Sequence, residues 1–404
     1  MLFNLVTNEL QKIIKKKRIL LILATLCVTI FLSYLNTFNS FKASSNKPKL
    51  KIQQNEKSLL SINKRLNNSV LSTKERQSLV NQNKYLKINT KTLKKLASPQ
   101  KSEWKKILKE EVTDLQNLKS NIYKDNTTQK SSINNKIDMD NYYINHNINP
   151  NDYNHKFNAT KFSSEIFSFL NILFLPLIII LGCCDTVSGA NNPPTIKVLL
   201  TKPISRGKIL FSKFISSIIS ITLSLFLCEF LTFIIIGIVF KFGNLLSPVV
   251  VGFDFKHIKG IQRIAEIGTH SHIIPMWQFL MESLCLQILF IIATASLATL
   301  ISVFVKNTSA STSINFVVII ILTFTNFLML TNSGSSPKSP FITKILPFLF
   351  TTYSNGIMLL SGNINRFTGI TFINVKLSIL VLIAWTIICY GIAHFKFTKQ
   401  DVFA

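Results

Sequence analysis

The stretch SGANNPPTIKVLLTKPISRGKILFSKF occupies residues 188–214, between two long apolar runs at about residues 162–184 and 209–240. It contains two adjacent prolines and five basic residues. Apolar runs of about 20 residues are long enough to cross a bilayer as helices. Because short loops rich in Lys and Arg stay on the cytoplasmic side, the stretch predicts a cytoplasmic loop between two membrane spans.

The whole chain has the composition of a multi-pass membrane protein. Its 404 residues are 48% hydrophobic, include 32 Phe and carry a formal net charge of +27. Six apolar runs qualify as spans. They cover about residues 19–38, 162–184, 209–240, 277–305, 314–330 and 375–395. We therefore expect an all-α integral membrane protein with six transmembrane helices.

The basic residues in short flanks predict the orientation of these spans in the cytoplasmic membrane. Residues 1–18, 185–208 and 396–404 are all basic and should be cytoplasmic, which places both termini inside. Residues 39–161, 241–276 and 331–374 should then be external. The long segment 39–161 is also basic, but long loops translocate largely regardless of charge. A cleaved signal peptide is the alternative for the N-terminus, yet its apolar run exceeds the usual 7–15 residues and no clear cleavage site follows.

Residues 2–18 read as an amphipathic helix lying in the headgroup plane. Leu2, Phe3, Val6, Leu10, Ile13 and Ile14 share one apolar stripe, and lysines crowd the C-terminal end. The alternative is a simple cytoplasmic extension of the first span, which apolar spacing alone does not separate from the first interpretation.

The external segment 39–161 predicts a helical hairpin domain. Leucine and isoleucine recur at spacings of three, four or seven, which favours three antiparallel helices between about residues 48 and 123. Ser72 and Glu75 form a predicted capping box, and Ser98 followed by Pro99 predicts another helix start. Residues 126–158 are Asn-rich and predict a loop.

The two shorter external segments carry fewer signals. The apolar patch at residues 345–350 is too short to span, which indicates a re-entrant or interfacial piece. Three histidines, His257, His270 and His272, with Asp254, raise the question of a zinc site. Their spacing is not the helical i, i+4 pattern, so we predict no metal site.

Chemistry inside the predicted spans is sparse. Glu229 and Glu282 are the clearest charges at membrane depth, and we consider them either contacts in a translocation path or headgroup-level pairs. The six cysteines all fall in or beside apolar runs, which excludes a disulfide-stapled external domain. No catalytic constellation and no phosphate-binding loop of the G-x-x-x-x-G-K-[ST] type occurs, so the chain is not expected to be an enzyme.

The order of residues in the loop resembles a known family signature. The segments DTVSG at residues 185–189, TIKVLLTKPISR at 195–206 and KILFSK at 208–213 resemble the loop between spans two and three of ABC-2 type transporter permeases. The segment LATLISVFVKN at residues 297–307 is similar to that family's end of span four. One departure is ANNPP at residues 190–194, where the family usually has acidic residues and Gly.

The resemblance implies a permease subunit of an ATP-dependent exporter. Two permease copies, identical or different, would associate with separate ATPase subunits that carry ATP and Mg²⁺, and this chain itself would need no cofactor. The loop and the N-terminal helix would contact the ATPase. The implied coupling residues are Ser188, Gly189, Thr195, Ile196, Lys197, Leu199, Leu200, Pro203 and Arg206.

Two other functions compete with export. A membrane sensor or mechanotransmission subunit would act through the external helical domain, but the six spans and the coupling loop argue against it. A nucleic-acid partner for the +27 charge is disfavoured because segment 39–161 is external and lacks a binding motif. Its basic surface is better suited to anionic membrane lipids or wall polymers.

Overall fold

The computed structural model describes residues 2–15, 18–44, 47–67, 72–97, 103–122, 127–150, 157–190, 204–257, 264–267, 270–331 and 340–399. The chain divides into two compact units. The span unit comprises Met1–Thr37, Lys161–Phe242 and Leu280–Ala404, and the insert unit comprises Phe38–Thr160 and Gly243–Phe279. Each unit is described by itself.

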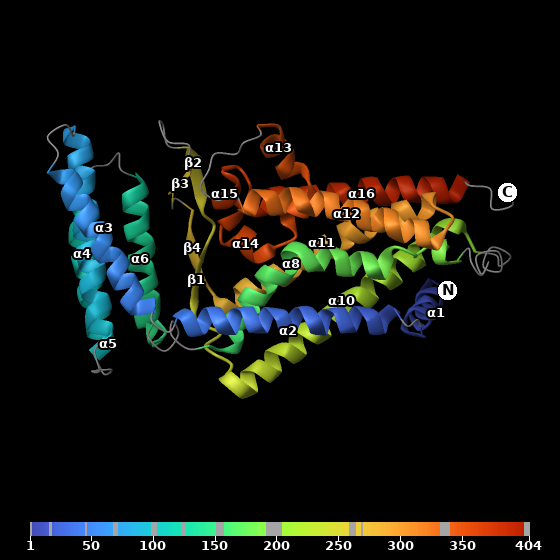
Figure 1. The fold of residues 1–404 in the computed structure, drawn as a ribbon, viewed down its shortest axis with the longest axis horizontal. Helices are drawn as coiled ribbons and strands as arrows, with labels where there is room; N and C mark the ends of the chain where they lie inside the picture. The colour runs from blue at the N-terminus through green and yellow to red at the C-terminus, as the bar shows by residue number, and fades with distance from the viewer. Residues whose placement is uncertain are drawn as a thin grey trace. The chain divides into compact units, whose positions relative to one another are not determined.

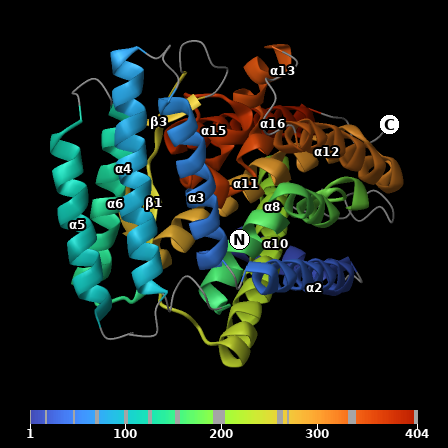
Figure 2. The ribbon, with the colours of Figure 1, turned by 60° about the vertical axis from the view of Figure 1, so that its left-hand side comes forward.

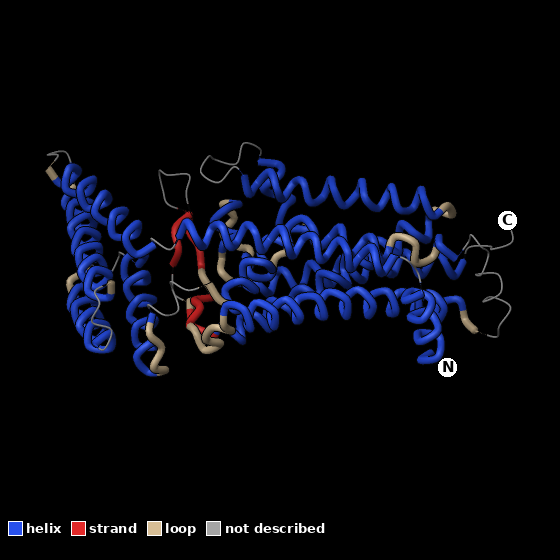
Figure 3. Tube along the Cα trace, turned by 60° about the horizontal axis from the view of Figure 1, so that its bottom comes forward, coloured by secondary structure: helices blue, strands red, loops and turns tan. Residues whose placement is uncertain are grey.

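Long apolar helices build the span unit, and they run side by side in Figures 1 and 3. Within the described residues, five helices are long and apolar enough to cross a membrane. They are α2 (Arg18–Ser44), α10 (Arg206–Phe240), α11 (Met276–Phe304), α12 (Thr308–Thr331) and α16 (Val375–Lys399). These correspond to predicted spans one, three, four, five and six.

The second predicted span is the helix α8 (Ala159–Cys183), which contains Pro176 in its interior. Its 25 residues match the length of a span, but its described apolar part is the shorter segment Phe174–Cys183. The count of six spans therefore stays a prediction.

The N-terminal segment forms a separate helix, α1 (Leu2–Lys15), which packs against α10. Leu2, Phe3 and Ile14 are exposed on its surface, whereas Glu9 is buried. Helix α1 is therefore amphipathic. Its apolar side chains face outward, and the buried carboxylate of Glu9 lies on the side that packs against α10. The helix α1 ends at Lys15 and α2 begins at Arg18.

Short helices fill the region between α12 and α16. They are α13 (Pro340–Ile345), the 3₁₀ turns η3 (Leu346–Phe348) and η4 (Phe350–Tyr353), α14 (Gly356–Leu360) and α15 (Asn363–Thr368). Phe350 and Tyr353 are fully buried. The indole Nε1 of Trp385 in α16 donates to the Phe348 carbonyl at 2.8 Å, and Thr351 Oγ1 donates to the Leu322 carbonyl in α12 at 3.1 Å. Within the apolar patch, Leu346, Pro347 and Phe350 are buried, whereas Ile345 and Phe348 are exposed, so this short broken segment packs only partly against the two long helices.

In the insert unit, three helices occupy the segment expected to be helical: α3 (Lys47–Leu66), α4 (Thr73–Leu96) and α5 (Trp104–Ser120) (Figure 2). The predicted capping box is confirmed, because Ser72 accepts from the Glu75 N–H at 3.3 Å and Glu75 Oε2 accepts from the Ser72 N–H at 3.2 Å. The predicted start at Ser98 and Pro99 lies outside the described residues.

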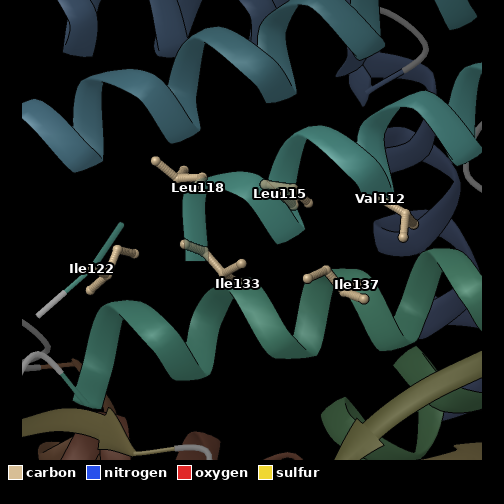
Figure 4. Close-up of a cluster of buried hydrophobic side chains, with 6 residues drawn as sticks. All are labelled: Val112, Leu115, Leu118, Ile122, Ile133 and Ile137. Carbon is tan, nitrogen blue, oxygen red and sulfur yellow. The ribbon is translucent and has the colours of Figure 1, made fainter. Parts of the chain in front are cut away.

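The prediction of a loop over residues 126–158 is wrong for most of its length. A fourth helix, α6 (Thr127–Asn145), lies there and packs against α5. Figure 4 shows Ile133 and Ile137 of α6 facing Val112, Leu115 and Leu118 of α5. Asn-rich sequence has weak intrinsic helix propensity, but two apolar residues four positions apart give the helix a face to bury, and tertiary packing outweighs propensity.

The structure is mostly helical, as expected for an all-α membrane protein, but the segment 241–276, predicted as an external loop, contains short strands. β1 (Pro248–Val251) pairs antiparallel with β4 (His272–Pro275), and Val249 lies opposite Ile274. β2 (Asp254–His257) pairs antiparallel with β3 (Ile264–Ile267). Helix α6 packs against β1, β3 and β4. The β-branched residues of these strands suit pairing, but such short runs are ambiguous in sequence.

Candidate functional site

The described ends of the predicted coupling loop enter one packed region of the span unit, which we call the junction. The junction comprises residues 183–190, 205–213, 302–303 and 393–398, together with Thr308 and Ser311. Ser188 and Gly189 form part of the 3₁₀ turn η2 (Ser188–Ala190), and Arg206 is the first residue of α10. The other six predicted coupling residues, Thr195, Ile196, Lys197, Leu199, Leu200 and Pro203, lie outside the described residues.

Ser188 is held by the connection between α11 and α12. Ser302 Oγ, in the last turn of α11, accepts the N–H groups of both Val187 and Ser188 at 3.0 Å. Thr308 Oγ1, at the start of α12, donates to the Ser188 carbonyl at 3.3 Å. Ser188 and Ser302 are buried, so these bonds satisfy backbone groups that water does not reach. The turn after α8 is thereby fixed to two other helices.

The last turn of α8 is fixed in the same way. Ser311 Oγ in α12 donates to the Cys184 carbonyl at 2.6 Å, which satisfies one of the carbonyls left unpaired at a helix C-terminus. Gly189 N–H donates to the Asp185 carbonyl at 2.9 Å. A Cβ on Gly189 would lie 2.7 Å from Asp185 Oδ2 and 3.2 Å from Asp185 Cβ, so any larger residue at this turn would require the Asp185 side chain to shift.

Arg206 connects the start of α10 to the end of α16. Its guanidinium Nη1 donates to the Thr398 carbonyl at 3.4 Å, and its side chain is half-buried. An apolar cluster also joins α10 and α16, and it includes residues from α11 and the turn after α8. Its members are Val187, Leu210, Val303, Ala393 and Phe397. The turn after α8 and the helices α10, α11 and α16 are therefore in direct contact at the loop ends.

A buried ion pair attaches α1 to the junction. Lys213 Nζ, in the second turn of α10, lies 3.0 Å from Glu9 Oε2, and Lys12 Nζ lies 2.8 Å from Glu9 Oε1. Burial acts to raise the pKa of the Glu9 carboxyl, but Lys213 and Lys12 outweigh burial, so this pKa lies below its usual value. Glu9 is therefore ionised at neutral pH and holds the N-terminal helix against α10.

The two predicted membrane-depth carboxylates have different surroundings. Glu229 Oε1 in α10 accepts a hydrogen bond from Gln287 Nε2 in α11 at 2.8 Å. Glu282 is half-buried in the second turn of α11. The structure thus brings Glu229 to a neutral partner that the sequence interpretation did not name.

The histidines do not assemble a metal site in the described part of the chain. His270 Nδ1 contacts Asp254 Oδ2, and both side chains are well exposed. Over the described ranges, no group of three or more His, Cys, Asp or Glu side chains is placed to hold a metal ion.

Sequence reasoning missed the residues that join the junction together. Ser302, Thr308 and Ser311 are ordinary small polar residues at helix ends, and nothing in their spacing indicates a partner more than 110 residues away. A signal did exist for the ion pair, because Lys213 lies within an apolar run and a lysine there needs an acceptor. The sequence did not say that the acceptor is Glu9.

The apolar helices and the packed junction define the class as a multi-pass membrane protein. Within that class, the model of the family described as ABC-2 family transporter protein matches residues 3–402, which is nearly the whole chain. The chain belongs to this family, and the resemblance seen in the loop is confirmed. Membership implies an ABC-type permease that works with an ABC ATPase and is a transport component and not typically the catalyst. No match was found among curated proteins.

Proposed function

We propose that this chain is the permease subunit of an exporter in the cytoplasmic membrane, driven by a separate ATPase subunit. The single observation that carries the proposal is the attachment of the loop ends to the junction. Ser188 bonds to α11 and α12, and Arg206 bonds to the end of α16, so a force on the loop would reach these three helices. The family membership supplies the ATPase as the source of that force.

The coupling surface in this proposal is the loop 188–206 together with α1. Closure of the ATPase would push on the loop residues Thr195, Ile196, Lys197, Leu199, Leu200 and Pro203. Ser188, Gly189 and Arg206, at the loop ends, would pass this force to the helices, because Ser188 itself is buried. Because Glu9 and Lys213 tie α1 to α10, the N-terminal helix would move with the loop. Two permease copies, alike or different, would form the path, with both termini cytoplasmic, ATP and Mg²⁺ on the ATPase, and basic surfaces against anionic lipid.

The experiment is co-purification of the full chain with its ATPase, followed by measurement of ATP hydrolysis in lipid vesicles. Charge placed on the apolar loop by Leu199→Asp and Leu200→Asp should abolish complex formation, because an apolar docking contact does not tolerate a buried carboxylate. Ser309→Ala, at an exposed position of α12, is the matched control and should leave hydrolysis unchanged. If the Leu199 and Leu200 variants form the complex and hydrolyse ATP as the wild type does, the coupling assignment is wrong.

An experiment on the insert unit distinguishes export from the alternative function, a membrane sensor. Removal of residues 48–123 from the full chain should leave ATPase stimulation intact if the insert unit is accessory to export. Loss of a signalling output with no effect on hydrolysis would favour the sensor.

A further inference from the structure

A line of polar side chains crosses the interior of the span unit, in helices that are otherwise apolar. We call Ser168, Asn355, Ser283, Gln287 and Glu229 the polar tract. Asn355 Nδ2 donates to the Ser168 carbonyl in α8 at 2.8 Å. The next residue, Gly356, begins α14 close against Ser283 of α11, and Gln287 follows Ser283 by one helical turn and bonds Glu229 of α10. The tract therefore reaches from α8 to α10.

In the Glu229–Gln287 contact, each side chain has one oxygen that forms no hydrogen bond with a described residue. Glu229 Oε2 and Gln287 Oε1 are buried, and neither has a hydrogen-bond partner among the described residues. Gln287 is 1% exposed, and the neighbouring Ser283 is fully buried with its hydroxyl also unpartnered. Both oxygens can accept a hydrogen bond, and the one on Glu229 belongs to a carboxyl group.

The contact lies far from either end of its helices. Glu229 precedes the end of α10 at Phe240 by 11 residues, and Gln287 follows the start of α11 at Met276 by 11 residues, from 240 − 229 and 287 − 276. At 1.5 Å per residue, each lies about 17 Å from that helix end, about half the thickness of a bilayer core. Glu229 and Gln287 therefore lie in the interior of their helices, about three turns from the nearer helix end.

An ionised carboxyl in such a place requires a compensating group. Burial of an unpaired charge is strongly unfavourable, and Gln287 supplies only one neutral N–H. A metal ion such as Ca²⁺ takes six to eight oxygen ligands, more than this contact offers. A guanidinium or ammonium group carries the opposite charge and several N–H donors, so it fills both acceptors at once.

We propose that Glu229 and Gln287 form a binding site for a cationic guanidinium or ammonium group of the transported substrate. This inference rests on the proposed export function, and it narrows the substrate to cationic compounds or peptides with basic side chains. Both acceptors are buried in the described conformation, so the cation enters when α10 and α11 separate. The other residues of the polar tract would then offer hydrogen-bonding groups to the cation as it passes between α10 and α11.

The test is binding of octylguanidinium to the purified full chain in detergent, compared with octylurea, which has the same tail and a neutral head of similar shape. Binding is followed by the shift in melting temperature as a function of concentration. Wild-type protein should bind octylguanidinium about tenfold more tightly than octylurea, as expected for charge-assisted hydrogen bonds. Glu229→Gln should abolish the preference, whereas Glu229→Asp should retain part of it and Glu103→Gln, at an exposed position of the insert unit, should retain it fully.

Two results would overturn the proposal. Equal binding of the two probes by the wild type would mean that the Glu229–Gln287 contact has no preference for a cationic group. An unchanged preference in Glu229→Gln would place cation recognition elsewhere. Because this test uses no ATP and no ATPase, its failure leaves the coupling proposal standing, and loss of ATPase coupling leaves the binding result standing.

Discussion

Lys213 Nζ lies 3.0 Å from Glu9 Oε2, and this ion pair joins residues 204 positions apart. The Lys213 side chain is 6% exposed and the Glu9 side chain 11% exposed. The pair is therefore shielded from water, and it connects the N-terminal helix directly to the helix that follows the coupling loop.

The first prediction concerns Glu9. Glu9→Gln leaves Lys213 as a buried charge without a carboxylate and should lower the stability of the span unit by about 3 kcal/mol. Lys12→Met removes only the more exposed partner, whose side chain is 51% exposed, and should cost about 0.5 kcal/mol or less. Melting of the full chain in detergent measures both. Equal losses for the two variants would contradict the role given to Lys213.

The same contact predicts a pH dependence. Because the pKa of Glu9 is lower in the folded protein than its ordinary value of 4.5, the stabilisation is present above pH 4.5 and is lost as pH falls through the lower, folded value. Melting measured between pH 3 and 7 should show this loss in the wild type and a smaller one in the double variant Glu9→Gln, Lys213→Met.

The second prediction concerns Ser302, whose hydroxyl accepts two backbone N–H groups. Ser302→Ala leaves both donors buried and unpaired and should cost about 2 kcal/mol or more. If the junction transmits force, ATPase stimulation should fall as well. Ser309→Ala is the control for serine removal in the same region. Normal hydrolysis in Ser302→Ala, with lowered stability, would limit Ser302 to a structural role.

The third prediction concerns three charges in the insert unit. Lys136 Nζ of α6 lies 3.1 Å from Glu111 Oε2 and 2.6 Å from Asp140 Oδ1. Burial is the main cause that raises the pKa of Glu111 to about 7, with Asp140 adding to the rise and Lys136 opposing it. Two carboxyl groups share one lysine, so the site binds a proton more readily when folded than when unfolded.

The raised pKa of Glu111 makes the insert unit less stable as the pH rises. The raised pKa gives stability that is complete below the ordinary value of 4.5 and is lost as pH rises through about 7. Glu111→Gln should remove this slope and leave stability at pH 8 unchanged or higher. Adding Asp140→Asn leaves Lys136 unpaired and should cost about 2 kcal/mol, less than for a fully buried charge because 27% of its side chain is exposed. Hydrogen exchange in α5 and α6 of the full chain reports both, and a slope that persists in Glu111→Gln would contradict the assignment.

The fourth prediction concerns the close approach of α14 to α11. A Cβ on Gly356 would lie 3.1 Å from the Ser283 carbonyl oxygen and 3.2 Å from Leu286 Cβ, so Gly356→Ala should cost about 2 kcal/mol through overpacking. Gly391 in α16 has open space around the same position. Gly391→Ala should therefore be neutral or slightly stabilising, and melting of the two variants gives the comparison. A neutral Gly356→Ala would mean that α14 moves away from α11 without cost.

Parts of this protein were predictable because their cause is local. The capping box at Ser72 and Glu75 involves residues three apart, and the long apolar helices follow from composition over about 20 residues. The family resemblance was also carried by contiguous residues, in the loop and at the end of span four. Orientation across the membrane and the number of spans stay predictions.

Other parts depend on contacts that no local window contains. Helix α6 exists although its sequence is Asn-rich, because Ile133 and Ile137 have a surface of α5 to bury against. The strands of the insert unit exist because β1 and β4, some 20 residues apart, satisfy each other's backbone groups. A short segment with weak propensity takes the structure that its neighbours offer.

The sequence by itself determined the class of the protein, the apolar helices and the loop that carries the family signature. Only the tertiary structure decided what holds that loop and which partners the charged residues have. The length of an apolar run and the charge of a loop are sums over neighbouring residues, so both can be predicted from the sequence. The pairing of Glu9 with Lys213, of Ser302 with the backbone at Ser188 and of Gln287 with Glu229 depends on positions in space, because hydrogen bonds act over about 3 Å regardless of sequence separation.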